Sequence, residues 1–510
     1  MSLTTTTPDT YRGWQAEKSG FIGNLSGVGF SLMAAAAVIA LIPIYLHSWS
    51  GAVVALPLAA LLLLLAYGRV MGLAAEEWIF LAVRHQIAVA TKRNLFYSGV
   101  FAPADKEGNQ PMDLPGVLAR LRILTASDGQ GGKLGIVHNP IDNTYTLVAR
   151  VTFPGLALID TDRQNNRVRQ WATFLRSQCK EDGAIVRLQV HQRSLPDDGE
   201  ALRSWTSRHI SPDAPPAAVQ ALGELMESAG PAATIRETYL SVTLSSTRAR
   251  LAVRGAGGGQ IGAAAVLVRE FNAMTGTLSS AGLQVVEVLD PRRVAAVIRT
   301  AFDPHSQQML AARTSAAGLE SWTGTAPGLD PALAGPAAAE TTWGLYQHDG
   351  AWTVTYQVRG FPQSEVFATF LQPLLRPRSN ARRSMSLVYE PVGPSKARRE
   401  LSRERSKRQA AGILRKKTGR AESEDERRED AIARDQDIAR ASGQGVVRMV
   451  ALIAVTVTNL DELETACAEL QADASDAGLE LRRCWGAMDE AFAAAALPLG
   501  MGLPPRRTAL

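Results

Sequence analysis

Cysteine is scarce in this sequence, with only Cys179, Cys467 and Cys484 among 510 residues. The number is odd and no C-x-x-C spacing occurs, which argues against a disulfide framework and a cysteine-based zinc site. The seven histidines form no H-E-x-x-H motif, and no G-x-S-x-G motif is present. We therefore expect a protein of a reducing compartment that is not an enzyme, with no catalytic, cofactor-binding or metal-binding residues.

A phosphate-binding loop is also missing. The glycine-rich run from Gly255 to Gly262 is the one candidate, because glycine amides before a helix can bind an anion. A P-loop would continue with Lys and Ser or Thr, whereas Ala263 and Ala264 follow here. A dinucleotide fingerprint would need a preceding strand in a parallel unit. We expect a loop that enters a helix at Ile261.

Charged residues are absent from two long stretches near the N-terminus, Ser19 to Leu46 and Ser48 to Gly68. At about 1.5 Å per residue each stretch is longer than a hydrocarbon core of about 30 Å. Only His47 separates them, so they predict a transmembrane helical hairpin within residues 19–73. A cleaved signal peptide would have one shorter apolar stretch. A buried soluble hairpin would not have the unbroken leucines from Leu61 to Leu65.

The charges that flank the two stretches predict their orientation. Basic residues precede the first stretch and follow the second, and the turn between them has no Lys or Arg. By the positive-inside rule both termini face the cytoplasm of a bacterial cell, and the protein is a two-pass inner-membrane protein. The helix of the second stretch is expected to continue into the cytoplasm as a juxtamembrane helix from Glu76 to Arg93, where basic residues meet either anionic lipid or solvent. The expected membrane-interface residues are Trp14, Lys18, Trp49, Arg69, Arg84, Lys92 and Arg93.

From Leu134 the pattern changes to short strands and helices. The expected order is strand, helix, strand, strand, helix, strand, with a hairpin of 135–138 and 145–153 at the start and further strands at 185–193, 238–244 and 283–289. This is the split βαβ, ferredoxin-like order of an α+β fold. The intervening amphipathic helix carries Val168, Trp171, Leu175 and Cys179 on one face, so Cys179 is expected to pack in the core.

A second module of the same kind is predicted after an Ala/Gly/Pro-rich linker at 315–340. Tyr145-Thr146-Leu147-Val148 resembles Trp352-Thr353-Val354-Thr355, and the later elements repeat: a helix at 364–375, strands at 384–389, 446–457 and 479–484, and a helix at 460–471 capped by Asn459. The expected domains are a tail (1–18), the hairpin (19–73), a juxtamembrane helix and connector (74–133), the first module (134–314), the linker, the second module (341–500) and a tail (501–510).

Residues 396–440 form a charged insertion within the second module. The part up to Arg420 has eleven basic and two acidic residues, and the remainder has eight acidic and four basic residues. The two halves predict either an antiparallel helical hairpin or a solvated arm. No aromatic residue lies among the basic ones, so we expect no direct sequence-specific nucleic-acid binding. The expected partner-contact residues are Arg403, Arg405, Lys407, Arg408, Arg415, Lys416 and Lys417.

Several of these features together resemble a known family. The stretch Tyr145 to Pro196, with Phe153-Pro154-Gly155, Trp171, Val186-Arg187-Leu188-Gln189 and Arg193-Ser194-Leu195-Pro196, resembles the N-terminal, non-motor half of type IV secretion and conjugation ATPases. The charged insertion and the closing Ala494-Ala495-Ala496-Leu497-Pro498-Leu499-Gly500 resemble the same half. The start is similar to the small two-helix inner-membrane subunit that accompanies that ATPase. The whole resembles the actinobacterial integral membrane family of conjugative elements.

This resemblance implies a structural or assembly component of a conjugative DNA-transfer apparatus. Its implied partners are membrane lipid, a separate secretion or conjugation ATPase and other inner-membrane channel subunits, and it leaves homo-oligomerisation open. The chain lacks the Walker motifs of the ATPase, so ATP hydrolysis is not carried over. Two alternatives stay open: an EccE-like membrane component of type VII secretion, and a membrane-tethered enzyme.

Overall fold

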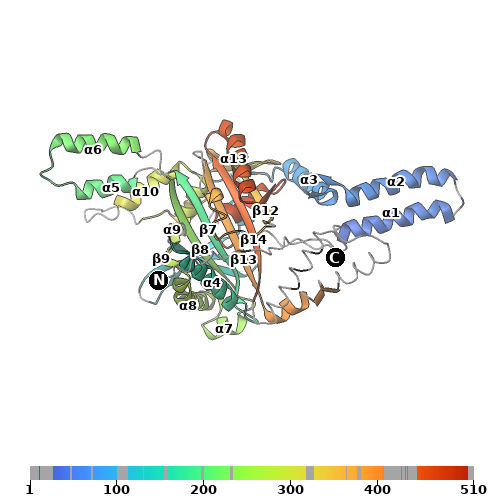
Figure 1. Cartoon of the computed structure of the whole chain (residues 1–510), viewed down its shortest axis with the longest axis horizontal. Helices are drawn as coiled ribbons and strands as arrows, with labels where there is room; N and C mark the ends of the chain where they lie inside the picture. The colour runs from blue at the N-terminus through green and yellow to red at the C-terminus, as the bar shows by residue number, and fades with distance from the viewer. Residues whose placement is uncertain are drawn as a thin grey trace, which may run out of the picture. The chain divides into compact units, whose positions relative to one another are not determined.

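The computed structural model describes residues 27–45, 49–70, 73–99, 113–129, 131–153, 159–196, 200–229, 234–316, 327–362, 364–375, 381–400 and 445–502, with single positions between them. The chain is α+β, as expected, and its larger unit contains a wide antiparallel sheet (Figure 1). This unit comprises residues 1–12, 95–394 and 445–503. A smaller unit comprises residues 13–94, 395–444 and 504–510.

The smaller unit begins with two helices that lie side by side, α1 (Gly27–Tyr45) and α2 (Trp49–Tyr67) (Figure 1). The Tyr67 hydroxyl donates a hydrogen bond to the Met33 sulfur at 3.3 Å, which ties the end of α2 to α1. Within the described part of the chain, α2 is the one helix long and apolar enough to cross a membrane. The apolar part of α1, Val28–Pro43, is shorter, so the second span stays a prediction.

The juxtamembrane helix is present as α3 (Ala75–Ala90). It is separate from α2, because the strands β1 (Arg69–Val70) and β2 (Leu73–Ala74) pair antiparallel between the two helices. Gly68 N donates to Leu64 O at 2.7 Å and closes α2, and Ala75 N donates to Gly68 O at 2.9 Å. The chain therefore turns between α2 and α3.

In the larger unit, 13 strands within the described ranges form one sheet. Its order is β3-β10-β11-β12-β14-β13-β7-β8-β6-β5-β4, with β9 also paired to β6 and β15 to β12. The strands are β3 (Leu95–Tyr97), β4 (Arg122–Ser127), β5 (Lys133–Asn139), β6 (Thr144–Thr152), β7 (Ile185–Pro196), β8 (Thr234–Ser245), β9 (Gln284–Val288), β10 (Ala338–Thr341), β11 (Tyr346–His348), β12 (Ala351–Gly360), β13 (Arg382–Val392), β14 (Val446–Val457) and β15 (Glu480–Arg483).

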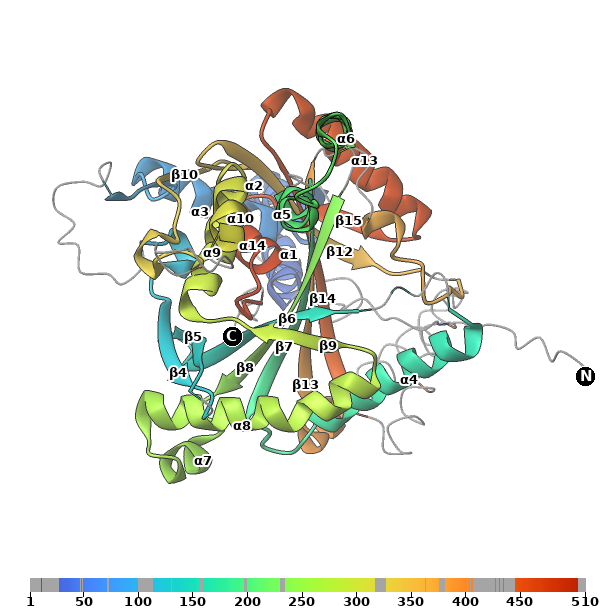
Figure 2. The ribbon, with the colours of Figure 1, turned by 90° about the vertical axis from the view of Figure 1, so that its left-hand side faces the viewer.

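Helices cover both faces of this sheet (Figure 2). Side chains alternate along each strand, so neighbours on β6 enter different cores. Leu147 packs in a cluster with residues of α4 and α8, whereas Val148 packs in a cluster with residues of α9 and α14.

The helices are α4 (Thr161–Gln178), α5 (Glu200–His209), α6 (Pro216–Ala229), α7 (Arg250–Gly255), α8 (Gly259–Ser280), α9 (Pro291–Phe302), α10 (Ser306–Ala316), α13 (Leu463–Asp476) and α14 (Met488–Ala496), with short 3-10 turns η2 (Gly116–Leu118), η4 (Pro331–Leu333), η5 (Pro373–Leu375) and η6 (Leu460–Glu462).

The two halves of the sheet repeat one strand order. In the first half the neighbours are β9-β6-β8-β7, and in the second half they are β15-β12-β14-β13. The strands β7 and β13 pair antiparallel and join the halves. At matching positions, the hydroxyls of Thr146 and Thr243 lie 2.9 Å apart, and those of Thr353 and Thr456 lie 2.7 Å apart. The sequence repeat therefore corresponds to a structural repeat within one continuous sheet.

Three expectations differ from the structure. The helix expected at 364–375 is wrong: this segment has turns and η5, because Val366 pairs with Tyr11 in an antiparallel bridge and Pro373 removes a helical N–H near the end of the segment. The expected linker at 315–340 ends in β10, which pairs with β3 and β11. The expected connector at 74–133 supplies β3 and β4 to the sheet. Short strands of Ala, Leu or Thr have little periodicity to reveal them.

Candidate functional site

The most organised polar site lies where the two halves of the sheet meet. Alternate residues of β7 share one face, and polar side chains from β6, β8 and β13 extend the row. Four of these side chains donate hydrogen bonds to the closing segment, residues 494–500, which begins in the last turn of α14. The residues of this seam site are Thr146, Arg187, Gln189, His191, Arg193, Ser241, Thr243 and Ser386.

Gln189 is the centre of the seam site and is fully buried. Its amide nitrogen donates to Leu497 O at 2.9 Å and to Ala494 O at 3.2 Å. Its amide oxygen accepts from Gly500 N at 2.8 Å. One side chain therefore satisfies three backbone groups of the closing segment, which buried backbone groups require.

Neighbouring side chains hold the rest of this segment. Ser386 donates to Ala495 O at 3.0 Å, Ser241 donates to Pro498 O, and Arg187 donates to Gly500 O at 2.7 Å. Gly500 has φ +67°, and a Cβ there would lie 2.1 Å from the Thr243 hydroxyl. Glycine is thus required by both the backbone and the contact.

Two buried ionisable residues continue the row. His191 lies with Nδ1 2.9 Å from the Ser386 hydroxyl, and burial, together with the nearby Arg193 charge, lowers its pKa to about 3. Arg193 pairs with Glu237 at 2.6 Å and donates to the Thr300 hydroxyl at 2.9 Å. Burial opposes the charge of Arg193, but Glu237 and Tyr239 outweigh it and raise the pKa. In their charged states, Arg193 and Glu237 hold β7 and β8 together, and Arg193 also holds α9.

The seam site therefore serves to position the closing segment. Its donors are used on backbone carbonyls of the same chain, and its histidine is kept neutral by burial. Val186-Arg187-Leu188-Gln189 and Ala494 to Gly500 are two of the motifs behind the family resemblance. The structure joins them directly, across more than 300 positions in sequence.

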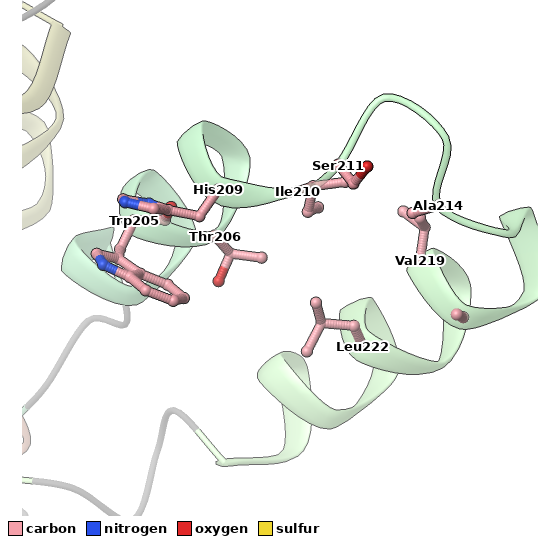
Figure 3. Close-up of a pocket in the computed structure, with 9 residues that line it drawn as sticks. Trp205, Thr206, His209, Ile210, Ser211, Ala214, Val219 and Leu222 are labelled. Atoms are coloured by element: carbon pink, nitrogen blue, oxygen red, sulfur yellow. The ribbon is translucent and has the colours of Figure 1, made fainter.

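A second feature is the helical pair α5 and α6, inserted between β7 and β8 (Figure 3). Trp205 stacks on His209 with ring centroids 4.3 Å apart, and His209 Nδ1 donates to Trp205 O at 2.7 Å. With Val219 and Leu222 of α6 they line an open apolar pocket of about 210 Å³. A second pocket, of about 530 Å³, has the polar lining residues Ser364, Thr369, Gln372, Ser475 and Asp476.

The glycine-rich run forms a turn between α7 and α8, so a helix and not a strand precedes it. Gly258 N donates to Val253 O at 2.8 Å, and a Cβ on Gly262 would lie 2.2 Å from Val253 O. The expected loop into a helix is confirmed, and α8 begins at Gly259. Cys179 is half-buried with its thiol 3.3 Å from Val446 O, and burial raises its pKa, as expected for a packing residue.

The expected contact residues are only partly described. Arg403 and Arg405 are exposed and helical. Lys407, Arg408, Arg415, Lys416, Lys417, Trp14 and Lys18 lie outside the described residues, as does most of the charged insertion. Trp49, Arg69, Arg84, Lys92 and Arg93 are all exposed in the smaller unit. Across the ranges that the structure describes, no cluster of His, Cys, Asp and Glu could hold a metal ion.

The sequence matches no protein-family model and no curated protein.

Proposed function

We propose that this protein is a membrane-anchored assembly component of a type IV secretion-like conjugative apparatus, which docks a separate ATPase at the cytoplasmic face of the bacterial inner membrane. The observation that carries the proposal is the seam site. Two sequence motifs that resemble the non-motor half of the conjugation ATPases meet in it through Gln189, Arg187 and Gly500.

In this proposal the two halves of the sheet are ferredoxin-like modules. The support is the strand order, because β9-β6-β8-β7 and β15-β12-β14-β13 are both the order of a split βαβ unit with antiparallel neighbours. In the first half, α4 follows β6 and α8 follows β8, as that unit requires. In the second half α13 takes the place of α8, while turns replace the helix that would match α4.

The membrane anchor is the α1 and α2 pair. Its support is the apolar length of Trp49–Tyr67 and the exposure of its large side chains, including Val53 at 74% and Leu64 at 66%. Apolar side chains at such exposure are unfavourable in water and favourable in lipid. Both termini are proposed to face the cytoplasm, because the basic residues Arg69, Lys92 and Arg93 follow α2.

The docking element is proposed to be the charged insertion, residues 396–440. It lies between β13 and β14, which is the position that α5 and α6 occupy between β7 and β8. Val392 pairs with Val446 and Pro196 pairs with Thr234, so each insertion leaves and re-enters the sheet at paired residues. Either insertion can therefore be replaced by a short turn without moving a strand.

This geometry gives a matched experiment in the full-length protein. Residues 396–440 are replaced by a short Gly/Asn loop, and residues 197–233 are replaced by the same loop in the control. We expect the first deletion to abolish co-purification, in detergent, with a conjugation-type ATPase that is co-expressed with this protein. The control deletion is expected to retain the ATPase.

Reversing the charge of Arg403, Arg405, Lys407, Arg408, Arg415, Lys416 and Lys417 should reproduce the loss without a deletion. Circular dichroism and thermal unfolding would show that each variant still folds. Unchanged ATPase recovery from the charge-reversed protein would contradict the docking role of the insertion.

A further inference from the structure

Helix α3 presents an apolar face to the outside of the smaller unit. Ile79, Phe80, Val83 and Ile87 are exposed by 42%, 67%, 52% and 55%. At 100° per residue these four side chains fall within about 100° of the helix circumference. Trp78 and Leu81, on the other side of α3, are less exposed. The strip is therefore an outward face of α3.

The position of α3 in the chain indicates what covers this face. The helix begins eight residues after α2 ends, across the β1 and β2 turn, and it contacts α2. A face so close to the end of a membrane-spanning helix is held at the depth of the bilayer surface. Because the chain turns at Gly68, α3 is a separate helix whose long side can meet the bilayer.

The charges around α3 are those of a surface helix. Arg84 is exposed beside the apolar strip, and Lys92 and Arg93 are exposed directly after the last turn. Exposed cations beside an apolar face are typical of helices that lie in the interface of a membrane with anionic lipid. A water-exposed helix would not need the apolar strip, and a spanning helix would not contain Glu76, Glu77 and Arg84.

We propose that α3 lies in the headgroup region of an anionic phospholipid bilayer, with Ile79, Phe80, Val83 and Ile87 against the acyl chains and Arg84, Lys92 and Arg93 at the lipid phosphates. The inference depends on the anchoring by α2 in the proposed function. It adds a second membrane contact, which fixes the rotation of the smaller unit at the bilayer surface.

The test uses the full chain in vesicles of phosphatidylcholine and phosphatidylglycerol. Nitroxide labels are attached to Phe80→Cys, to Val83→Cys and to a control on the opposite side of the helix, Ala88→Cys. Labelled protein without an added cysteine gives the background from Cys179, Cys467 and Cys484. Collisions with oxygen, which enters lipid, are compared with collisions with a water-soluble nickel chelate.

We expect the oxygen-to-nickel ratio to be several-fold higher at Phe80 and Val83 than at Ala88. Equal ratios at the three positions would overturn the inference, because the strip would then lie in the same environment as the control position. Low collision rates with both reagents at Phe80 and Val83 would also overturn it, because protein and not lipid would cover the strip.

Two further measurements test the contact with anionic lipid and the α2 anchor separately. In vesicles of phosphatidylcholine alone we expect the ratio at Phe80 to fall; an unchanged ratio would overturn the assignment of anionic lipid to the three basic residues. Flotation of the same proteoliposomes after alkaline extraction tests the α2 anchor separately. Protein that floats with a water-exposed α3 contradicts this inference alone, whereas protein that is extracted contradicts the anchor in the proposed function.

Discussion

The side chain of Gln189 hydrogen-bonds to the backbone on both sides of its amide group. Its oxygen accepts from Gly500 N at 2.8 Å, and its nitrogen donates to the carbonyls of Leu497 and Ala494. The two residues are 311 positions apart in sequence. Through this contact the last described segment of the chain is fastened to β7, which is also the strand that joins the two halves of the sheet. The contacts of the seam site thus fix the path of the C-terminal segment.

Replacing Gln189 by leucine should release this segment. Gln189→Leu leaves two carbonyls and one N–H without partners, and each buried unsatisfied group costs about 1–3 kcal/mol. We expect a loss of at least about 3 kcal/mol in the free energy of unfolding, together with faster proteolysis after residue 490. Gln192→Leu on the other face of β7 is the control. Equal stability of the two variants would show that the seam contact is incidental.

Two glycines of α8, Gly262 and Gly276, differ in the space around them. A Cβ on Gly262 would lie 2.2 Å from Val253 O, whereas a Cβ on Gly276 meets nothing within 4 Å. We expect Gly276→Ala to stabilise the protein by about 0.5–1 kcal/mol through helix propensity, and Gly262→Ala to destabilise it by about 1–3 kcal/mol through overpacking. Chemical unfolding measures both. Similar effects would mean that α7 does not pack on the start of α8.

A buried ion pair fixes α13 to the sheet. Arg383 and Asp473 lie 2.6 Å apart, with their side chains only 3% and 1% exposed. Asp473→Asn breaks the close buried pair and leaves Arg383 with Glu469, at 3.9 Å, as a carboxylate partner, so we expect a loss of about 3 kcal/mol in unfolding free energy. Glu464→Gln breaks the pair of Glu464 with Arg483, in which the Glu464 side chain is 79% exposed, and should change stability little. The double variant Arg383→Met with Asp473→Leu should recover most of the lost unfolding free energy. If it recovers none, the loss is due to packing and not to the broken ion pair.

Local patterns predicted many of the elements but not how they combine. The strand β14 has the expected bounds, Val446 to Val457, because its run of aliphatic residues is bounded by Gly445 and Asn459. The 3-10 turn η6 begins at Leu460, where a helix is expected, since the Asn459 side chain accepts from Asp461 N, and the α-helix α13 follows from Leu463. Helix α9 could have been found, because Asp290 and Pro291 mark a helix start before Val294, Val297 and Ile298.

Other features depend on contacts that no local pattern contains. Helix α14 is mostly alanine, so its burial against β12, β13 and β14 leaves no periodic signal. The polar residues Gln189, Ser241 and Ser386 look like ordinary strand residues until the closing segment covers them. The expected helix at 364–375 failed partly because Val366 pairs with the distant Tyr11, and the place of β10 beside β3 is decided by pairing across about 240 residues.

His348 predicts an acid sensitivity of the larger unit. It is fully buried with Nδ1 donating to Phe302 O, so Nε2 accepts from the Thr353 hydroxyl at 2.7 Å. Burial lowers the His348 pKa from 6.5 to about 4. Between these values the unfolded chain binds more protons than the folded one, so the free energy of unfolding falls as pH drops from about 6.5 towards 4.

For His348 the loss between pH 7 and pH 5 is about 2 kcal/mol. His348→Asn keeps a donor for Phe302 O but cannot titrate, so its melting temperature should fall less than that of the native protein over this range. His209→Asn, at an exposed position on α5, is the control and should retain the native pH dependence. Thermal unfolding in detergent at both pH values measures the difference. Parallel curves for the native protein and His348→Asn would mean that acid acts elsewhere, because both proteins keep the buried His191 and only the native protein carries the buried imidazole of His348.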